Sequence, residues 1–273
     1  MTNIQRVREE SLVYTYFDGA QAEARIVAWE GRITSWMDQF ERARLNPGTF
    51  DCHIALAAEM YNVPYASVPT FDYYDEEHAT LAHPEGSLSL RGISKRCRHG
   101  LNYRMQVGRL ATTTGMTYAA AQEAFNIYHA TTPELRVWWD TVEQEVRTNR
   151  KLYNMYGRCM PFMGSRLEES LMDAIIAFKP QSGLGDLVTG VQWRCQADDD
   201  WPAYARIPFN NHDSLTALSR ERDVMRIAKL YKKYAEAPVY IHGEPLIIPI
   251  EIKKSVADAH GVHRWTNMVK VKM

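Results

Sequence analysis

Residues 12–16 read LVYTY and residues 17–25 read FDGAQAEAR, and this stretch decides how the rest of the chain is interpreted. The first five residues are apolar, β-branched or aromatic, which predicts a buried strand. Asp18 comes where this strand ends and the chain turns toward a helix that we expect to begin near Ala20. An acid at that place is typical of a helix N-cap. The spacing D-x-x-Q-x-E-x-R adds a second interpretation, in which Asp18 is a functional carboxylate.

The composition is that of an ordinary globular protein, with 273 residues, 45% hydrophobic and 24% charged. A formal net charge of −1 gives no global case for nucleic-acid binding, so any contact with DNA must come from local basic faces. The four cysteines stand far apart, which argues against zinc and disulfides and favours a reducing compartment. No apolar run approaches the roughly 18 residues of a membrane span, and the N-terminus is too polar for a signal peptide. We therefore expect a soluble, cytoplasmic protein with no membrane partner.

Hydrophobic periodicity and turn signals predict an α+β fold, with helices in the middle of the chain and strands at its two ends. The segment 64–90, with its prolines and acidic run, is expected to be an irregular surface excursion. The predicted elements are helices over about 50–60, 92–110, 117–129, from Thr132-Pro133 onward and 219–235, a hairpin around 210–213, and a strand over 246–252.

A second carboxylate, Asp213, lies in the sequence NHDS (211–214) at the predicted hairpin. A hairpin tip can hold a carboxylate beside the end of another strand. Phosphoryl transfer by two divalent cations about 3.5–4 Å apart needs such a pair, and Mg²⁺ prefers hard oxygen ligands of this kind. The alternative is an ordinary turn, in which Asn and Asp are favoured for their own backbone chemistry.

A basic row is expected on one face of the helix 94–108, where Lys95, His99 and Tyr103 are spaced four residues apart. Such a row suits a triphosphate bound along the helix, with a base near the aromatic ring. The alternative is a solvated basic face.

Taken in order, these residues resemble the family A DNA polymerases, the group of bacterial DNA polymerase I and its phage relatives. The stretch 18–25 resembles the first catalytic motif, and His212-Asp213 resembles a third motif, His-Asp-Glu, with Ser214 in place of the glutamate. The resemblance implies that Asp18 and Asp213 are catalytic and bind two Mg²⁺ ions, with Mn²⁺ as an alternative. It implies that Gln21 contacts the nucleotide and that Glu23 excludes a ribose 2′-hydroxyl.

The helix 94–108 resembles the fingers pattern R-x-x-x-K-x-x-x-F/Y-x-x-x-Y-G, with Lys95, His99, Tyr103 and Gly108 at four of its positions. His99 is a weaker and more pH-dependent phosphate ligand than lysine. Val107 stands where the family has a tyrosine at the insertion site.

Smaller matches keep the same order along the chain. Asp51-x-His53 resembles a fingers segment whose histidine touches the incoming phosphates; its alternative is a helix cap followed by a partly buried histidine. Tyr156-Gly157-Arg158 resembles a turn near DNA. The sequence PQSGLGDL (180–187) resembles a palm helix that reads the new base pair through its glutamine, although its glycines would otherwise suggest a loop. The residues that the resemblance places at DNA are Arg25, Arg158, Gln181 and His212.

The resemblance implies a palm built from residues 1–49 and 166–273, where a small antiparallel sheet packs with helices, and helical fingers over 50–165. Its substrates would be primer-template DNA and dNTPs. Only 17 residues precede Asp18 and no thumb is present, so we expect half of a split phage polymerase, completed by a second polypeptide that carries the thumb and, where one exists, the exonuclease. One alternative is a non-catalytic remnant that binds DNA or helps to assemble a replisome. Another is an unrelated α+β protein, which would not bring Asp18 and Asp213 together.

Overall fold

The computed structural model describes residues 12–163 and 169–273. It divides into two compact units, each treated by itself below. Unit 1 holds the described residues up to Ala22 together with Gln181–Tyr240 and Pro245–Met273, and unit 2 holds Glu23–Pro180 and Ile241–Glu244. No helix among the described residues has the length and apolar character needed to cross a membrane.

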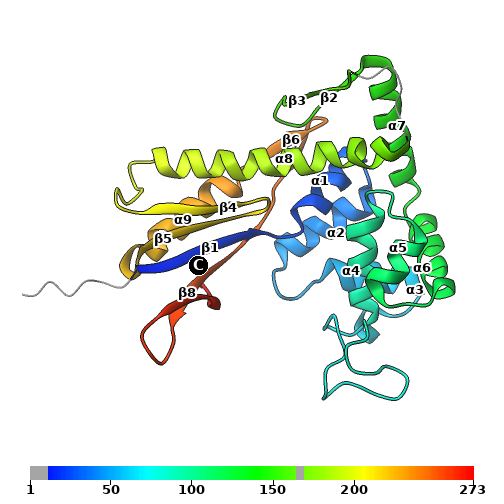
Figure 1. Ribbon diagram of the computed structural model, residues 1–273, viewed down its shortest axis with the longest axis horizontal. Coiled ribbons are helices and arrows are strands. Elements are labelled where there is room, and N and C mark those ends of the chain that lie inside the picture. Colours follow the sequence, from blue (N-terminus) through cyan, green and yellow to red (C-terminus); the bar gives the residue numbers. More distant parts are fainter. Residues whose placement is uncertain (1–11, 164–168) are drawn as a thin grey trace, which may run out of the picture. The chain divides into compact units, whose positions relative to one another are not determined.

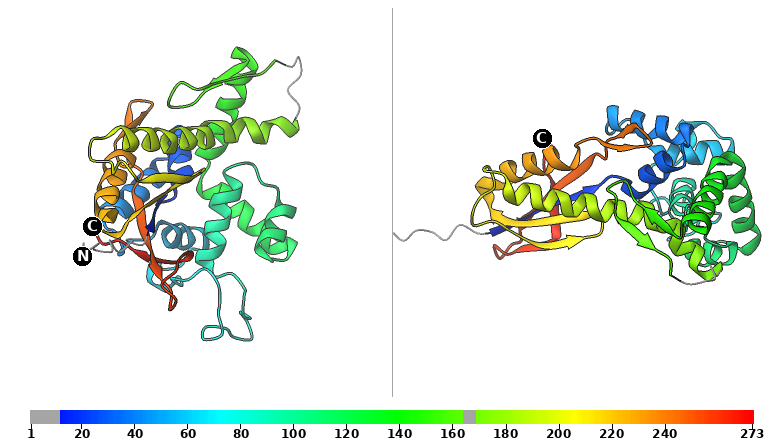
Figure 2. Two further views of the ribbon diagram at one scale, coloured as in Figure 1. Left: turned by 60° about the vertical axis from the view of Figure 1, so that its left-hand side comes forward. Right: turned by 90° about the horizontal axis from the view of Figure 1, so that it is seen from above.

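Unit 1 is built on a five-stranded antiparallel sheet with the strand order β4-β5-β1-β8-β9 (Figure 1). Its strands are β1 (Leu12–Gly19), β4 (Arg206–Asn211), β5 (Ser214–Arg220), β8 (Ile250–Ala257) and β9 (His263–Lys270). The β8–β9 hairpin is the red end of the chain in Figure 2. The sheet confirms the expected α+β class and the hairpin around 210–213.

Alternation along β1 gives the sheet two different faces. Val13 and Phe17 are buried at 0% and 2% exposure and lie on the face that helix α9 (Val224–Ala235) covers. The ring of Phe17 lies 4.8 Å from that of Tyr231 on α9. The C-terminal part of α8 (Glu169–Ala197) lies on the same face, because Gln192 accepts a hydrogen bond from Asn210 at 2.6 Å. The other face carries Tyr14, Tyr16 and Asp18.

Two predicted boundaries in unit 1 were wrong. Residues 214–220 continue the sheet and 221–223 form a short 3-10 helix, so the helix expected from residue 219 begins at Val224. The expected strand 246–252 is interrupted at Pro249, which cannot donate to a strand ladder. It is divided between β7 (Glu244–Leu246), which pairs with β6 (Val239–Ile241), and β8.

Unit 2 is mainly helical. Its elements are α1 (Ala22–Glu30), which starts at the last residue of unit 1, α2 (Thr34–Leu45), α3 (Cys52–Tyr61), α4 (Leu90–Leu101), α5 (Val107–Thr114), α6 (Tyr118–Thr131), α7 (Glu134–Asn149), β2 (Lys151–Tyr153), β3 (Cys159–Pro161) and a 3-10 helix, Tyr65–Ser67.

Capping and periodicity explain the helices that were predicted well. The carboxylate of Asp51 accepts from the backbone N–H groups of His53 and Ile54 at 2.7 and 3.2 Å, which caps α3. Helix α3 then ends at Tyr61 and is followed by Asn62, which has a left-handed φ of 49° and lies two residues before Pro64. On α7 the apolar residues Leu135, Trp138, Val142 and Val146, which are spaced three or four positions apart, are buried. Residues 62–89 are largely irregular as expected and are drawn in cyan in Figure 1.

The helix expected over 92–110 is broken, which is a correction to the sequence analysis. Helix α4 ends at Leu101, and α5 begins at Val107. Residues from two other helices hold the chain at the break. Trp139 donates a hydrogen bond to the backbone carbonyl of Asn102 at 2.9 Å, and Tyr128 donates one to the side chain of Asn102 at 2.8 Å. Tyr103 therefore lies beyond the helix and does not extend its basic row.

The core of unit 2 contains two buried guanidinium groups. Arg25 and Arg98 are each 1% exposed. The ring of Phe40 lies between them, 4.8 Å from the guanidinium carbon of Arg25 and 5.0 Å from that of Arg98, and Trp36 lies 4.7 Å from Arg98. Stacking on aromatic faces is a recurrent way to place arginine where water is absent.

Candidate functional sites

The end of β1 and the β4–β5 turn bring Asp18 and Asp213 together in unit 1. Asp18 is the direct neighbour of Ser214 in the sheet, and the N–H of Gly19 donates to the carbonyl of Asp213 at 3.2 Å. A Cβ at Gly19 would lie 3.1 Å from that of Ala22, so the strand end has little room for a side chain. This arrangement contradicts the alternative in which an unrelated fold separates the two aspartates.

The two carboxylates interact electrostatically. The pKa of Asp18 is raised by burial and next by the negative charge of Asp213. A hydrogen bond from the Tyr16 hydroxyl at 3.1 Å and the positive charge of Lys253 lower the pKa, but by less. Burial raises the pKa of Tyr16 to about 12, and the charges of both aspartates act in the same direction. A carboxyl whose pKa is raised by burial and by a neighbouring acid, at a partly exposed strand end, is typical of functional sites.

The residues fit hard divalent cations such as Mg²⁺. Among the described residues no group of three or more His, Cys, Asp or Glu side chains is arranged to hold a metal. Asp18 and Asp213 nevertheless supply two carboxylates that are close enough for the charge of one to act on the other. Mg²⁺ usually takes only one or two carboxylates, with water and substrate phosphates completing its shell.

Tyr16 and Glu251 also belong to this site, and the sequence analysis missed both. Tyr16 lies two residues before Asp18 on the same face, a signal that strand alternation offered. Glu251 on β8 is the direct sheet neighbour of Asp18. It pairs with Lys253 at 3.4 Å and with Lys270 at 2.5 Å. Only the long-range pairing of β1 with β8 brings Glu251 here.

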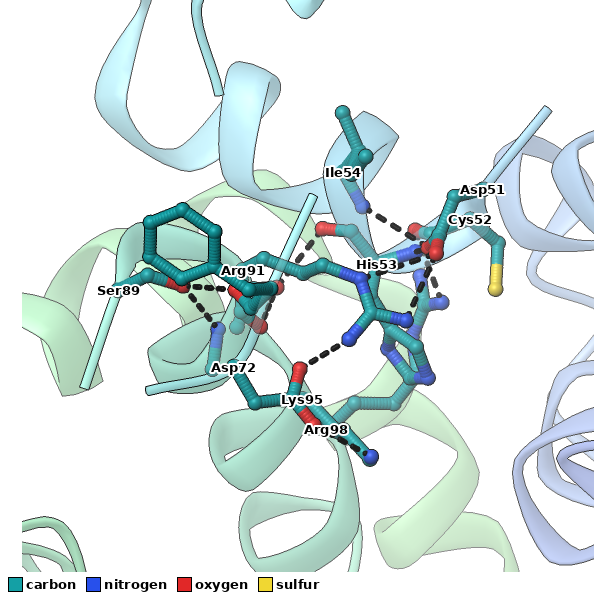
Figure 3. Close-up of polar contacts among 12 residues, drawn as sticks. Asp51, Cys52, His53, Ile54, Asp72, Ser89, Arg91, Lys95 and Arg98 are labelled. Atoms are coloured by element: carbon teal, nitrogen blue, oxygen red, sulfur yellow. Dashed lines mark hydrogen bonds and ion pairs between the residues drawn. The ribbon is translucent and has the colours of Figure 1, made fainter. Parts of the chain in front are cut away.

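A second cluster, in unit 2, joins α3, α4 and the irregular segment (Figure 3). Arg91 donates to Asp51 from Nε and Nη2 at 2.9 and 2.7 Å, and from Nη1 to Asp72. Lys95 donates to the other oxygen of Asp72 at 2.7 Å. Burial raises the pKa of Asp72, but the hydrogen bond from Lys95 and the charge of Arg91 outweigh it, so the pKa lies below its usual value. Asp72 thus binds both cations at the start of α4.

The remaining nucleotide candidates of unit 2 lie in different settings. His99 is exposed on α4 and makes no hydrogen bond or ion pair to any described residue. Tyr103 is held beyond the helix, where its hydroxyl donates to Oε2 of Glu23 at 2.9 Å. His53 is 6% exposed, and burial, followed by the charge of Arg98, lowers its pKa to about 3. A buried, neutral histidine is poorly suited to hold a phosphate.

Of the four residues expected at DNA, one is buried and three are exposed. Arg25 is buried against Phe40, so its observed role is in packing, which is a correction to its expected place at DNA. His212 is exposed in the β4–β5 turn, and Gln181 is exposed within α8, whose glycines are helical and not in a loop. Arg158 is exposed in the β2–β3 turn.

Gln21, the remaining nucleotide candidate, comes immediately before α1 with a left-handed φ of 53°. A bulky residue in that region is uncommon and marks a constrained turn.

No protein-family model matches the sequence, and no curated protein sequence does so. Among solved structures the chain is similar to the POL domain of Pol1 from M. smegmatis, in a complex with DNA primer-template and dNTP, with a TM-score of 0.68 and 19% identity. The similarity covers 90% of this chain and 40% of that chain. At this identity the similarity shows the fold, which is therefore that of part of a DNA polymerase domain.

Proposed function

We propose that the chain is the palm and fingers part of a family A DNA polymerase, which transfers a nucleotide from a dNTP to a primer 3′-hydroxyl under the direction of a template. The observation that carries this proposal is the juxtaposition of Asp18 and Asp213 at one end of an antiparallel sheet, in a fold similar to that of a polymerase domain. Burial and the negative charge of Asp213 both disfavour the ionised form of Asp18 at this position.

Asp18 and Asp213 would hold two Mg²⁺ ions, which supply activation of the attacking hydroxyl and neutralisation of the leaving phosphate charge when bound. The chain's own residues fix the geometry. The Tyr16 hydroxyl binds one oxygen of Asp18 and orients it. The backbone bond from Gly19 to Asp213 keeps the turn against the strand end.

The triphosphate would bind along α4. The fingers pattern can also be placed four residues upstream, where Arg91, Lys95 and Tyr103 match its R, K and Y positions. In that alignment His99 stands at the aromatic position and Arg104 at the glycine. This alignment is supported by the helix, because α4 spans Leu90–Leu101 and carries Arg91, Lys95 and His99 as one row. Lys95 and His99 then face the phosphates and the base. Glu23, held by Tyr103, takes the role of the sugar gate.

We further propose that a second polypeptide, as in a split phage polymerase, supplies the thumb that grips the duplex. Much of the affinity for duplex DNA comes from phosphate contacts, which a chain of net charge −1 supplies poorly. The non-catalytic alternative is favoured by three departures from the family pattern, at His99, Val107 and Ser214.

Primer extension tests the proposal. Asp18→Asn and Asp213→Asn should each lower Mg²⁺-dependent extension by more than about 100-fold, with the circular dichroism spectrum unchanged. Asp200→Asn, an exposed acid elsewhere in unit 1, should extend as the wild type does. The assay should be run with the chain alone and with co-expressed upstream polypeptides. Extension that survives either substitution at Asp18 or Asp213 would refute the catalytic assignment, and DNA binding without any extension would favour the remnant.

A further inference from the structure

Four aromatic side chains gather on the open face of the unit 1 sheet, which α8 and α9 leave uncovered. Trp265 on β9 lies at their centre, 5.0 Å from the ring of Tyr16 and 6.4 Å from those of Tyr14 and Phe209. All three contacts are edge-to-face, the favoured geometry of aromatic pairs. Phe209 and Trp265 are still 51% and 44% exposed. Large aromatic surfaces kept in water mark binding sites more often than chance placement.

A pocket of about 570 Å³ opens within this aromatic cluster, inside the range of about 300–1,000 Å³ that small-ligand sites occupy. Its lining residues are Tyr14, Phe209, Asn211, His263, Arg264, Trp265 and Thr266. The side chains of Asn211 and Thr266 make no hydrogen bond to any described residue. Arg264 donates from Nε to Asp258 at 2.9 Å, which leaves the far side of its guanidinium for a ligand.

This combination of groups matches a nucleobase. Aromatic rings stack on bases, amide and hydroxyl groups read a base edge, and a guanidinium adds a cation beside the ring. An apolar peptide fits less well, because it would remove Asn211, Arg264 and Thr266 from water without giving them partners. The aromatic residues also lie on the same face as Asp18. Tyr14 precedes Asp18 by four residues, about 13 Å along a strand.

We propose that this pocket binds an unpaired nucleobase of a single-stranded nucleic acid. The choice of nucleic acid as the ligand rests on the proposed function. A strand whose end lies at Asp18 can place a base that has left the duplex in the pocket, two or three nucleotides away. The pocket then acts as a holding site for the unpaired strand, distinct from the carboxylates that would bind metal.

Single-stranded DNA binding tests this assignment without catalysis. The probe is a 12-nucleotide oligonucleotide with one 2-aminopurine, titrated in the absence of Mg²⁺ and dNTP. Stacking contributes about 1–3 kcal/mol per base, so Trp265→Leu should weaken binding about 5- to 150-fold, and Trp265→Phe should retain most of it. Trp193→Leu is the matched control, because Trp193 is 70% exposed on α8, away from the pocket lining.

Three outcomes would overturn the proposal. One is that Trp265→Leu binds the oligonucleotide as tightly as the wild type does, and another is that Trp193→Leu loses as much affinity as Trp265→Leu. The third is that free dAMP competes for the site as well as an unlabelled oligonucleotide does, which would make the pocket a mononucleotide site. Phe209→Leu provides a second variant should Trp265→Leu fail to fold. The result also separates the two proposals. Loss of binding in Trp265→Leu together with no extension by the wild type, either alone or with co-expressed upstream polypeptides, supports the pocket and refutes the polymerase. Normal extension by the wild type together with unchanged binding by Trp265→Leu supports the polymerase and refutes the pocket.

Discussion

Asp72 stands where the proposed triphosphate must bind, so its removal should strengthen nucleotide binding. Its carboxylate holds Lys95 at 2.7 Å and also pairs with Arg91. A triphosphate that binds along α4 has to displace this carboxylate, because both anions need the same N–H donors. Asp72→Asn removes the competing charge and keeps the shape of the side chain.

The contacts set the size of the effect. In the ion pair between Asp72 and Lys95, the lysine side chain is 49% exposed. Exposed ion pairs contribute about 0.2–1 kcal/mol. The pair with Arg91 is less exposed, at 17% and 23%, but Arg91 keeps its two bonds to Asp51 after the substitution. A total of about 1–2 kcal/mol corresponds to a KM for dNTP that is about 5- to 30-fold lower. Unit 2 should lose a similar free energy of unfolding.

Single-nucleotide incorporation at varied dNTP concentration measures this change, and calorimetric titration with inorganic tripolyphosphate measures it even where the chain alone is inactive. Asp75→Asn is the matched control, since Asp75 lies in the same segment and binds His78 at 2.6 Å. We expect no change in that variant. An unchanged or higher KM in Asp72→Asn, or an equal gain in Asp75→Asn, would refute the assignment of the triphosphate to α4.

Three further substitutions test the packing and the electrostatics. Phe40→Ala removes the ring between the two buried guanidinium groups and should lower the free energy of unfolding by about 3–5 kcal/mol in urea titration; a loss below about 1 kcal/mol would contradict the stacking account. Burial lowers the pKa of His129 to about 4, so the stability tied to its neutral form is present above about pH 6.5 and is lost as the pH falls toward 4. Neither ring nitrogen has a partner among the described residues, so His129→Phe should raise Tm, and more at pH 5 than at pH 8; a pH-independent gain would argue against this reasoning. Because Asp213 and burial raise the pKa of Asp18, Asp18→Asn should raise Tm at pH 7 without metal and abolish the further rise on adding Mn²⁺, and a persistent Mn²⁺ shift would exclude Asp18 as a ligand.

Local signals predicted the elements whose ends are set within the segment itself. The apolar and β-branched residues 12–16 lie in β1, and the carboxylate of Asp51 caps α3, which was the alternative interpretation of that residue. The helix expected from Thr132-Pro133 onward is α7. The break after Leu101 has no such signal, because it depends on hydrogen bonds that Tyr128 and Trp139 make to Asn102 from other helices.

The candidate site was predictable only for residues that lie within a short local motif. Asp18 and Asp213 were singled out because the segments 18–25 and 211–214 each resemble a motif of the family A polymerases. Glu251 and Trp265 come from strands whose place beside β1 is decided by long-range pairing. The burial of Arg25 was missed because arginine is normally exposed, and only the fold places Phe40 over its guanidinium.

The most direct test of the proposed polymerase activity is the identity of the nucleotide that the chain adds opposite each of the four templating bases. Primer-templates that differ only at that base are incubated with Mg²⁺ and each dNTP, with the wild type and with Asp18→Asn. We predict that the wild type, supplied with its partner where one is required, adds the complementary nucleotide in each case and that Asp18→Asn adds none. Addition that ignores the template, or that persists in Asp18→Asn, would contradict the account.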